Sequence, residues 1–140
     1  DVTADTILGA VSGCACAFEI VRRYVGWTDL GTQRAVNGST AGHVLGPVQA
    51  NCPEHAALDD LVVTTHGDNQ VFGPTRGGDV TDNPLDSTAW LANFLSAHGM
   101  GLKAGDVILT GTYSGLLPVA PGQHWRAEIE GLGHVELRTC

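Results

Sequence analysis

Glu19 is the residue whose type and surroundings most directly suggest chemistry, because it is a carboxylate within an apolar run. In an extended strand alternate side chains share a face, so Glu19 would share its face with Ala15 and Ala17. A buried carboxylate needs a partner, and two alanines leave space beside it. A hard cation, which prefers oxygen ligands, would fit in that space and neutralise the charge of Glu19. A structural ion pair with Arg22 or Arg23 is the alternative.

A glycine-flanked loop, residues 37–43, carries the next group of polar side chains. Asn37, Ser39 and Thr40 would hydrogen-bond a substrate carboxylate or orient a water molecule, and Asx and Ser/Thr turns explain them equally well. His43, at the end of this loop, is the best candidate among the six histidines for proton transfer near neutral pH. A structural or surface histidine is the alternative at that position.

Thr110, Gly111 and Thr112 follow the apolar run DVIL and form the second candidate site for an anionic substrate. Gly111 permits a close approach of the backbone, and the hydroxyls and amides would bind a carboxylate or a developing enolate oxygen. Ordinary turn hydrogen bonds are the alternative. Ser114 in GTYSG is not predicted to be a nucleophile, because it stands at the fourth place of that motif and no helix is expected after it.

The composition argues against several classes of protein. A formal charge of −8, with only seven Lys and Arg, disfavours nucleic acids and anionic membranes as partners. No apolar run reaches transmembrane length, and the first residues lack the basic region of a signal peptide. The cysteines, at positions 14, 16, 52 and 140, lack the second Cys or His pair of a zinc site. We expect free thiols in a cytoplasmic protein, with a disulfide left open.

The elements that must position these residues are short, and most are strands. Helical periodicity and capping signals predict helices over 3–11 and 84–99. Apolar and β-branched runs between Gly and Pro turns predict the strands, which we place at 14–25, 43–48, 106–111, 116–120 and within 124–138, with a hairpin over 58–77 that turns at Gly67–Asp68–Asn69. The expected fold is a single α+β domain over 1–140, mainly β, with a rolled or barrel-like mixed sheet and one long helix.

Five motifs in a fixed order resemble one family of enzymes. They are AFEIVRR, NGSTAGHVLG, WLANFLSAHG, LKAGDVILTGTYSGLLPVAPGQ and GLGHVEL. Together they are similar to the C-terminal part of the 2-keto-4-pentenoate hydratase and 4-oxalocrotonate decarboxylase group of the fumarylacetoacetate hydrolase superfamily. The resemblance implies that family's mixed β-roll, a divalent metal (usually Mg²⁺) and a 2-oxo acid substrate.

The resemblance also implies roles for individual residues. Glu19 falls on a metal ligand of the family, whose other ligands come from a Glu-x-Glu pair before this strand. No such pair precedes Glu19 here, so the domain is expected to lack the family's N-terminal segment. Upstream residues or a second chain would then supply the ligands, or the metal site is lost. Arg22 replaces an acid of the family and suggests a catalytic role toward a substrate with an extra carboxylate.

These observations leave three hypotheses for function. The first is a lyase (hydratase, decarboxylase or C–C hydrolase) that acts on a small 2-oxo acid through a metal-stabilised enolate. The second is a metal-free cyclase or isomerase that uses the same cavity, with Arg22 in place of the cation. The third is a non-catalytic oligomer subunit. A homo-oligomer is expected, with a partner chain as a possible source of the missing segment.

Overall fold

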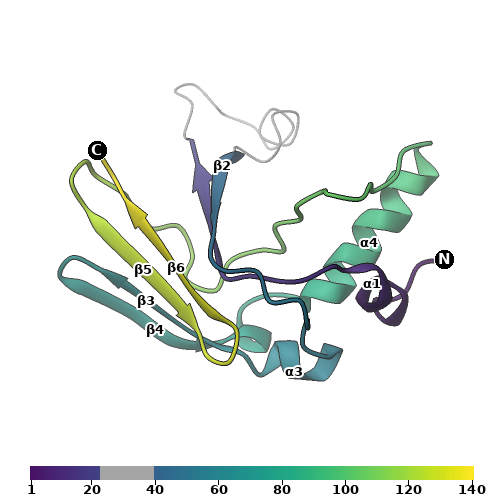
Figure 1. Cartoon of the computed structure of the whole chain (residues 1–140), viewed down its shortest axis with the longest axis horizontal. Helices are drawn as coiled ribbons and strands as arrows, with labels where there is room; N and C mark the ends of the chain where they lie inside the picture. The colour runs from purple at the N-terminus through teal and green to yellow at the C-terminus, as the bar shows by residue number, and fades with distance from the viewer. Residues whose placement is uncertain (23–39) are drawn as a thin grey trace.

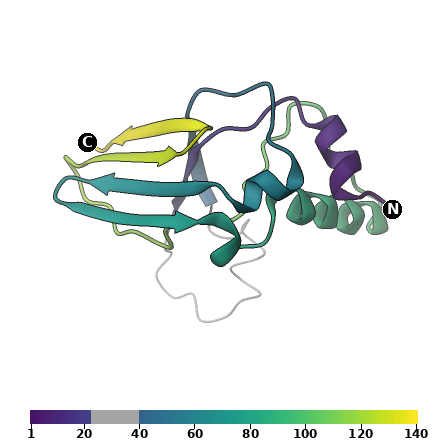
Figure 2. The same cartoon turned by 90° about the horizontal axis from the view of Figure 1, so that it is seen from below.

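The computed structural model describes residues 1–22 and 40–140, which form two antiparallel sheets and a group of helices (Figure 1). The four-stranded sheet and helices α1 and α4 occupy opposite ends of the molecule, and the C-terminus and the N-terminus lie at these ends in both views (Figures 1 and 2). The elements in chain order are α1 (Ala4–Ala10), β1 (Ala17–Val21), β2 (Thr40–Leu45), α3 (His55–Asp59), β3 (Val62–Gly67), β4 (Gln70–Arg76), a 3-10 turn (Gly77–Asp79), α4 (Pro84–Ala97), β5 (His124–Ile129) and β6 (Gly133–Arg138).

The larger sheet has four strands in the order β4-β3-β5-β6, and every neighbouring pair is antiparallel. Residues of the two central strands, β3 and β5, alternate between a buried and a more exposed face, as expected for a sheet with one side on the core. The buried face contributes to the first apolar cluster, whose members are Cys16, Val63, Ala127, Ile129, Leu132 and Val135. We call this the sheet cluster.

Strands β1 and β2 form a separate antiparallel pair that packs against the four-stranded sheet near β6. Phe18 of β1 and Val44 of β2 contact the sheet cluster. Gly46 allows this close approach, because a Cβ atom there would lie 2.1 Å from the carbonyl oxygen of His134. One side of the pair is therefore committed to the core, and the more exposed side carries Glu19 and His43 together with Val21 and Leu45.

The helices form the second apolar cluster, which we call the helix cluster. It contains Ile7 of α1, Leu58 of α3, and Leu85 and Ala89 of α4. Helix α4 begins at Pro84, as predicted, and the structure shows Asn83 as its N-cap. Figure 2 shows α1 lying beside α4.

Several predicted elements are confirmed. Both predicted helices are present, Thr3 caps α1, and the predicted hairpin turns between Gly67 and Gln70. The late strands form the β5–β6 hairpin. The fold is α+β with more strand than helix, and no helix among the described residues is long and apolar enough to span a membrane. Within residues 1–22 and 40–140 the sheets stay open and all strand pairs are antiparallel, so no closed barrel forms.

Other elements differ from the prediction. Of the predicted strand 14–25, the described part pairs regularly over Ala17–Val21, with an isolated bridge at Cys14, and residues 23–25 lie outside the described residues. The predictions of strands at 106–111 and 116–120 were wrong: these residues run from α4 back to β5 without joining a ladder (Figure 1). An apolar run becomes a strand only where a partner edge is available, and here the flanking glycines turn the chain away. Helix α3 was not predicted, since it is short and has no side-chain cap.

Candidate functional site

The pairing of β1 with β2 places two of the predicted site residues beside each other. Glu19 is directly opposite His43 in the ladder, and both are exposed. Because Phe18 and Val44 point into the core, their neighbours Glu19 and His43 point to the outer face. Thr40, at the start of β2, donates a hydrogen bond from its Oγ1 to Oε1 of Glu19. A carboxylate, an imidazole and a hydroxyl therefore share one surface.

The exposure of Glu19 corrects one expectation. The sequence suggested a buried carboxylate beside Ala15 and Ala17, but Glu19 is exposed and lines neither of the two hollows described below. The physical reason is the alternation of the strand, which gives the core side to Phe18. Arg22 follows β1 and is also exposed. Asn37 and Ser39 lie outside the described residues.

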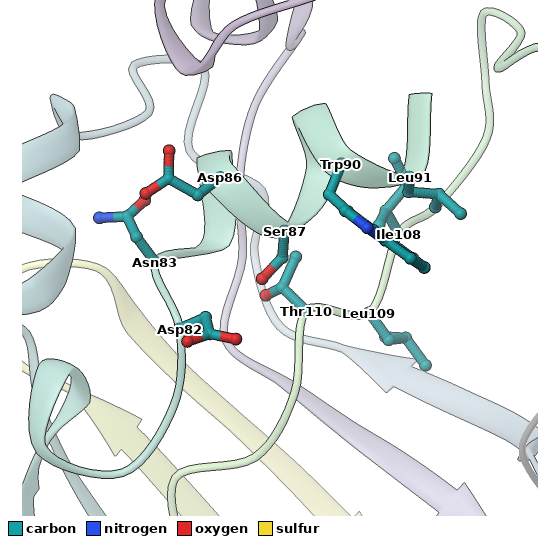
Figure 3. A pocket seen from close by; sticks show the side chains of 9 residues that line it. All are labelled: Asp82, Asn83, Asp86, Ser87, Trp90, Leu91, Ile108, Leu109 and Thr110. Atoms are coloured by element: carbon teal, nitrogen blue, oxygen red, sulfur yellow. The ribbon is translucent and has the colours of Figure 1, made fainter. Parts of the chain in front are cut away.

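Thr110 lies on a hollow of about 680 Å³ between the start of α4 and the returning segment. Figure 3 shows its lining residues, with the hydroxyls of Ser87 and Thr110 turned toward each other and the carboxylate of Asp82 nearby. The rest of the wall is formed by Asn83, Asp86, Trp90, Leu91, Ile108 and Leu109. We call this hollow the α4 pocket. Its polar groups lie at one end and its apolar groups at the other, which suits a small molecule with a polar head and a short hydrocarbon part.

The backbone conformation at position 111 requires a glycine. The hydroxyl of Thr112 makes hydrogen bonds within its own turn. Gly111 has φ of 114°, and a Cβ atom there would lie 2.7 Å from Oγ1 of Thr81. The hydroxyl of Thr112 donates to the carbonyl oxygen of Gly115 at 3.3 Å and accepts from the amide of Ser114 at 3.4 Å. These are turn hydrogen bonds of the kind that the alternative interpretation of Thr112 expects.

A second hollow of about 640 Å³ lies on the other side of the same turn, against β4. Its wall includes Phe72, Thr112, Tyr113 and Ser114. Burial is the largest cause that raises the pKa of Tyr113, followed by the nearby charge of Asp59. The neutral phenol is therefore a hydrogen-bond donor throughout the physiological pH range.

The electrostatics of the α4 pocket involve a histidine that the sequence did not single out. Nε2 of His55, from α3, lies 2.8 Å from Oδ2 of Asp86. This hydrogen bond is the main cause that raises the pKa of His55 above its ordinary value of 6.5, with smaller contributions from the charges of Asp59 and Asp5. The run DNP before α4 signals a capped helix start, but nothing local indicates that α3 brings an imidazole to it.

The family model of the fumarylacetoacetate (FAA) hydrolase C-terminal region matches residues 1–139 of this chain. The chain belongs to the FAA hydrolase C-terminal family. This membership confirms the resemblance seen in the five sequence motifs.

Among its relatives, the chain is 34% identical over 134 residues to 2-hydroxyhexa-2,4-dienoate hydratase of Comamonas testosteroni, covering 94% of this chain and 50% of the relative. It is 34% identical over 110 residues to 4-oxalocrotonate decarboxylase of Pseudomonas putida, covering 79% and 41%. The structure of 4-oxalocrotonate decarboxylase from Pseudomonas putida G7, complexed with magnesium and adipate, matches with a TM-score of 0.86 and 28% identity, covering 99% of this chain and 53% of that one. The chain thus spans about half the length of the relatives it matches.

The described residues of this FAA hydrolase family member do not by themselves fit a complete magnesium site. Mg²⁺ takes near-octahedral oxygen coordination. Glu19 offers a carboxylate and His43 an imidazole, and no group of three or more His, Cys, Asp or Glu side chains suited to a metal occurs within residues 1–22 and 40–140. In the described part of the chain, Glu19 is at most one member of a larger ligand set.

Proposed function

We propose that this chain is the C-terminal-type domain of a lyase that acts on a small 2-oxo acid by hydration, decarboxylation or C–C cleavage. The observation that carries the proposal is the match of 99% of the chain, at a TM-score of 0.86, to a 4-oxalocrotonate decarboxylase. The identity to a dienoate hydratase over 94% of the chain supports the same class of substrate. Both named reactions act on a short unsaturated acid, so the same domain could serve both.

The outer face of β1–β2 is the proposed place of proton transfer. A 2-oxo acid reacts through its enol, so a group must deliver a proton to, or remove one from, a carbon atom. His43 is suited to this step because an imidazole titrates near neutral pH. Glu19 lies opposite His43 and would stabilise the charged imidazolium when it forms, and Thr40 orients the Glu19 carboxylate through its hydrogen bond.

Binding of the substrate carboxylate is assigned to the 110–112 turn and to Arg22, which follows β1. Thr110 and Gly111 would contribute a hydroxyl and backbone amides, and Arg22 would form an ion pair with a second carboxylate. We include Asn37, Ser39 and Thr112 in the proposed substrate-binding set on the sequence motifs alone. If the Arg22 guanidinium reaches the substrate, it would favour a dicarboxylate over a monocarboxylate, because it would neutralise the additional charge.

The proposed enzyme uses a divalent cation. Some of the ligands of this cation would come from outside the described residues. The magnesium and calcium held by the two matched decarboxylase structures support this. Glu19 would be the ligand supplied from β1. A homo-oligomer, or a partner chain equivalent to the remaining half of the relatives, would complete the site, and sedimentation velocity at micromolar concentration tests for this association. A strictly monomeric chain that binds Mg²⁺ tightly by itself would contradict the need for outside ligands.

The test uses the purified chain with Mg²⁺ or with a chelator. 2-Keto-4-pentenoate and 2-hydroxyhexa-2,4-dienoate are assayed for water addition, and 4-oxalocrotonate is assayed for release of CO₂. Binding of adipate is followed separately by NMR, so that recognition is measured even if chemistry requires a second chain. We expect His43→Asn to reduce turnover on the order of 100-fold and to leave adipate binding unchanged. Absence of both turnover and adipate binding would overturn the proposal.

A matched control separates the role of Glu19 from a general effect of charge. Glu130 is an exposed carboxylate in the turn that joins β5 to β6, far along the chain from the candidate site. Glu130→Gln removes the same charge as Glu19→Gln and should retain full turnover. Equal losses in both variants would show that net charge, and not the position of Glu19, controls the rate.

A further inference from the structure

The thiols of Cys14 and Cys52 lie near each other, Cys14 just before β1 and Cys52 just after β2, the two strands that carry the candidate site. Cys14 exchanges backbone hydrogen bonds with Gln49, with N···O distances of 3.0 and 2.8 Å. Cys52 follows Gln49 by three residues, and its side chain hydrogen-bonds that of Cys14. Both cysteines are free and half-buried. The chain before β1 is thus held against the chain after β2 (Figure 1).

The two thiols also come from different parts of the core. Cys14 packs against the sheet cluster. Cys52 packs against the helix cluster. A covalent bond between them would join the two clusters and would close a loop that contains Glu19, Thr40 and His43.

The other two cysteines do not share this arrangement. Cys16 is 2% exposed, and its thiol donates to the carbonyl oxygen of Ala127 at 3.6 Å. Cys140 is exposed at the end of the chain. All four cysteines lie within the described residues. Cys16 therefore serves as the control for a buried thiol, and Cys140 serves as the control for an exposed thiol.

We propose that Cys14 and Cys52 form a reversible disulfide site that fastens the base of the β1–β2 segment. This goes beyond the proposed function and does not depend on it. The oxidant is a small-molecule disulfide such as oxidised glutathione. One protein thiolate attacks it, forms a mixed disulfide and releases one reduced glutathione. The second protein thiolate then attacks the mixed disulfide at the protein sulfur and releases another, so two protein thiols are oxidised and one glutathione disulfide is reduced.

The surroundings of Cys14 suggest the order of these steps. Burial, with a smaller contribution from the Cys52 hydrogen bond, raises the pKa of Cys14 from 9.0 to about 12. A thiol attacks only as its thiolate, so Cys14 is a poor initiating group at neutral pH. Cys52 therefore takes the first attack, and Cys14 closes the bond once the mixed disulfide is held beside it. Formation should accelerate as the pH rises toward the pKa of Cys14.

The test exposes the full chain to an excess of oxidised glutathione and then measures intact mass and non-reducing peptide maps. We expect the wild type to lose two hydrogens through a Cys14–Cys52 cross-link, while Cys140 takes up glutathione and reports that the oxidant is active. Cys140→Ser should cross-link as the wild type does. Cys14→Ser should instead keep glutathione attached to Cys52, and Cys52→Ser should show no adduct on Cys14. Reduction should restore the original mass.

A second measurement keeps the proposal testable if one variant folds poorly. The oxidised Cys140→Ser protein should melt a few degrees above its reduced form, because a disulfide restricts the unfolded chain. Stable glutathione adducts on the wild-type Cys52 without a cross-link, or a cross-link that uses Cys140, would overturn the proposal. A cross-linked protein that melts at the same temperature or lower would contradict the fastening role.

Discussion

Glu19 and His43 lie opposite each other across the β1–β2 ladder, and both side chains are on the outer face of that pair. Thr40 holds the Glu19 carboxylate from the same face. The relationship matters because neither residue is in a buried cavity, so each is available to groups supplied from outside the described residues. Within the described residues the candidate site is therefore an open surface.

Glu19→Gln should abolish stabilisation of the protein by Mg²⁺ or Mn²⁺, because an amide oxygen is a poorer ligand for a hard cation than a carboxylate. In metal-free buffer the same change should have little effect, since Glu19 is exposed. Melting temperatures of the wild type and the variant, each with Mg²⁺ and with chelator, measure this. If Glu19 is instead an ion-pair partner of Arg22, the substitution lowers the melting temperature in chelator and the metal changes neither protein.

Stability should fall as the pH rises through the raised pKa of His55. The hydrogen bond to Asp86 favours the protonated imidazole, so the folded-state pKa lies above the unfolded value of about 6.5. The resulting stabilisation is fully present below pH 6.5 and is lost as the pH passes the folded pKa. NMR titration of the His55 ring should show the raised pKa, and Asp86→Asn should return it toward 6.5. An unchanged titration curve in Asp86→Asn would rule out this pairing.

Gly111→Ala should destabilise the protein by roughly 1–3 kcal/mol, because a non-glycine residue is strained at positive φ. The new methyl group would also meet the Thr81 hydroxyl, since the Cβ position is 2.7 Å from it. Gly101→Ala is the matched control, because nothing lies within 4 Å of its Cβ position and its φ is not in the left-handed region. Urea denaturation compares the two. Equal stability of both variants would show that the 110–112 turn relaxes freely.

Asn83→Ala should cost about 2–3 kcal/mol, because Asn83 is buried and makes three hydrogen bonds at the start of α4. Its Oδ1 accepts from the amide of Leu85, and its Nδ2 donates to the carbonyl oxygen of His55 and to Oδ1 of Asp59. Asn83→Ser should retain the cap and lose only the other two bonds, so its loss of stability should be intermediate. Thermal denaturation measures both, and a serine variant as unstable as the alanine variant would mean that the cap contributes nothing.

Some of this molecule follows from local sequence. Pro84 and the residues around it specify a capped helix, and the polar residues between His66 and Val71 specify a tight hairpin. These features depend on backbone preferences and on side-chain hydrogen bonds over a few positions. The role of Gly111 in a turn was accessible in the same way, because few other residues adopt its φ.

The sequence alone also indicated that Glu19 and His43 were candidates, through their types and their neighbours. Only the tertiary structure placed them opposite each other, because strand register depends on pairing between segments far apart in sequence. It also decided that Glu19 is exposed, since packing of Phe18 on the sheet cluster fixes which face is buried. The same is true of Cys14 and Cys52: each looks unremarkable in the sequence, and they meet because the chain returns after β2 to the residues before β1.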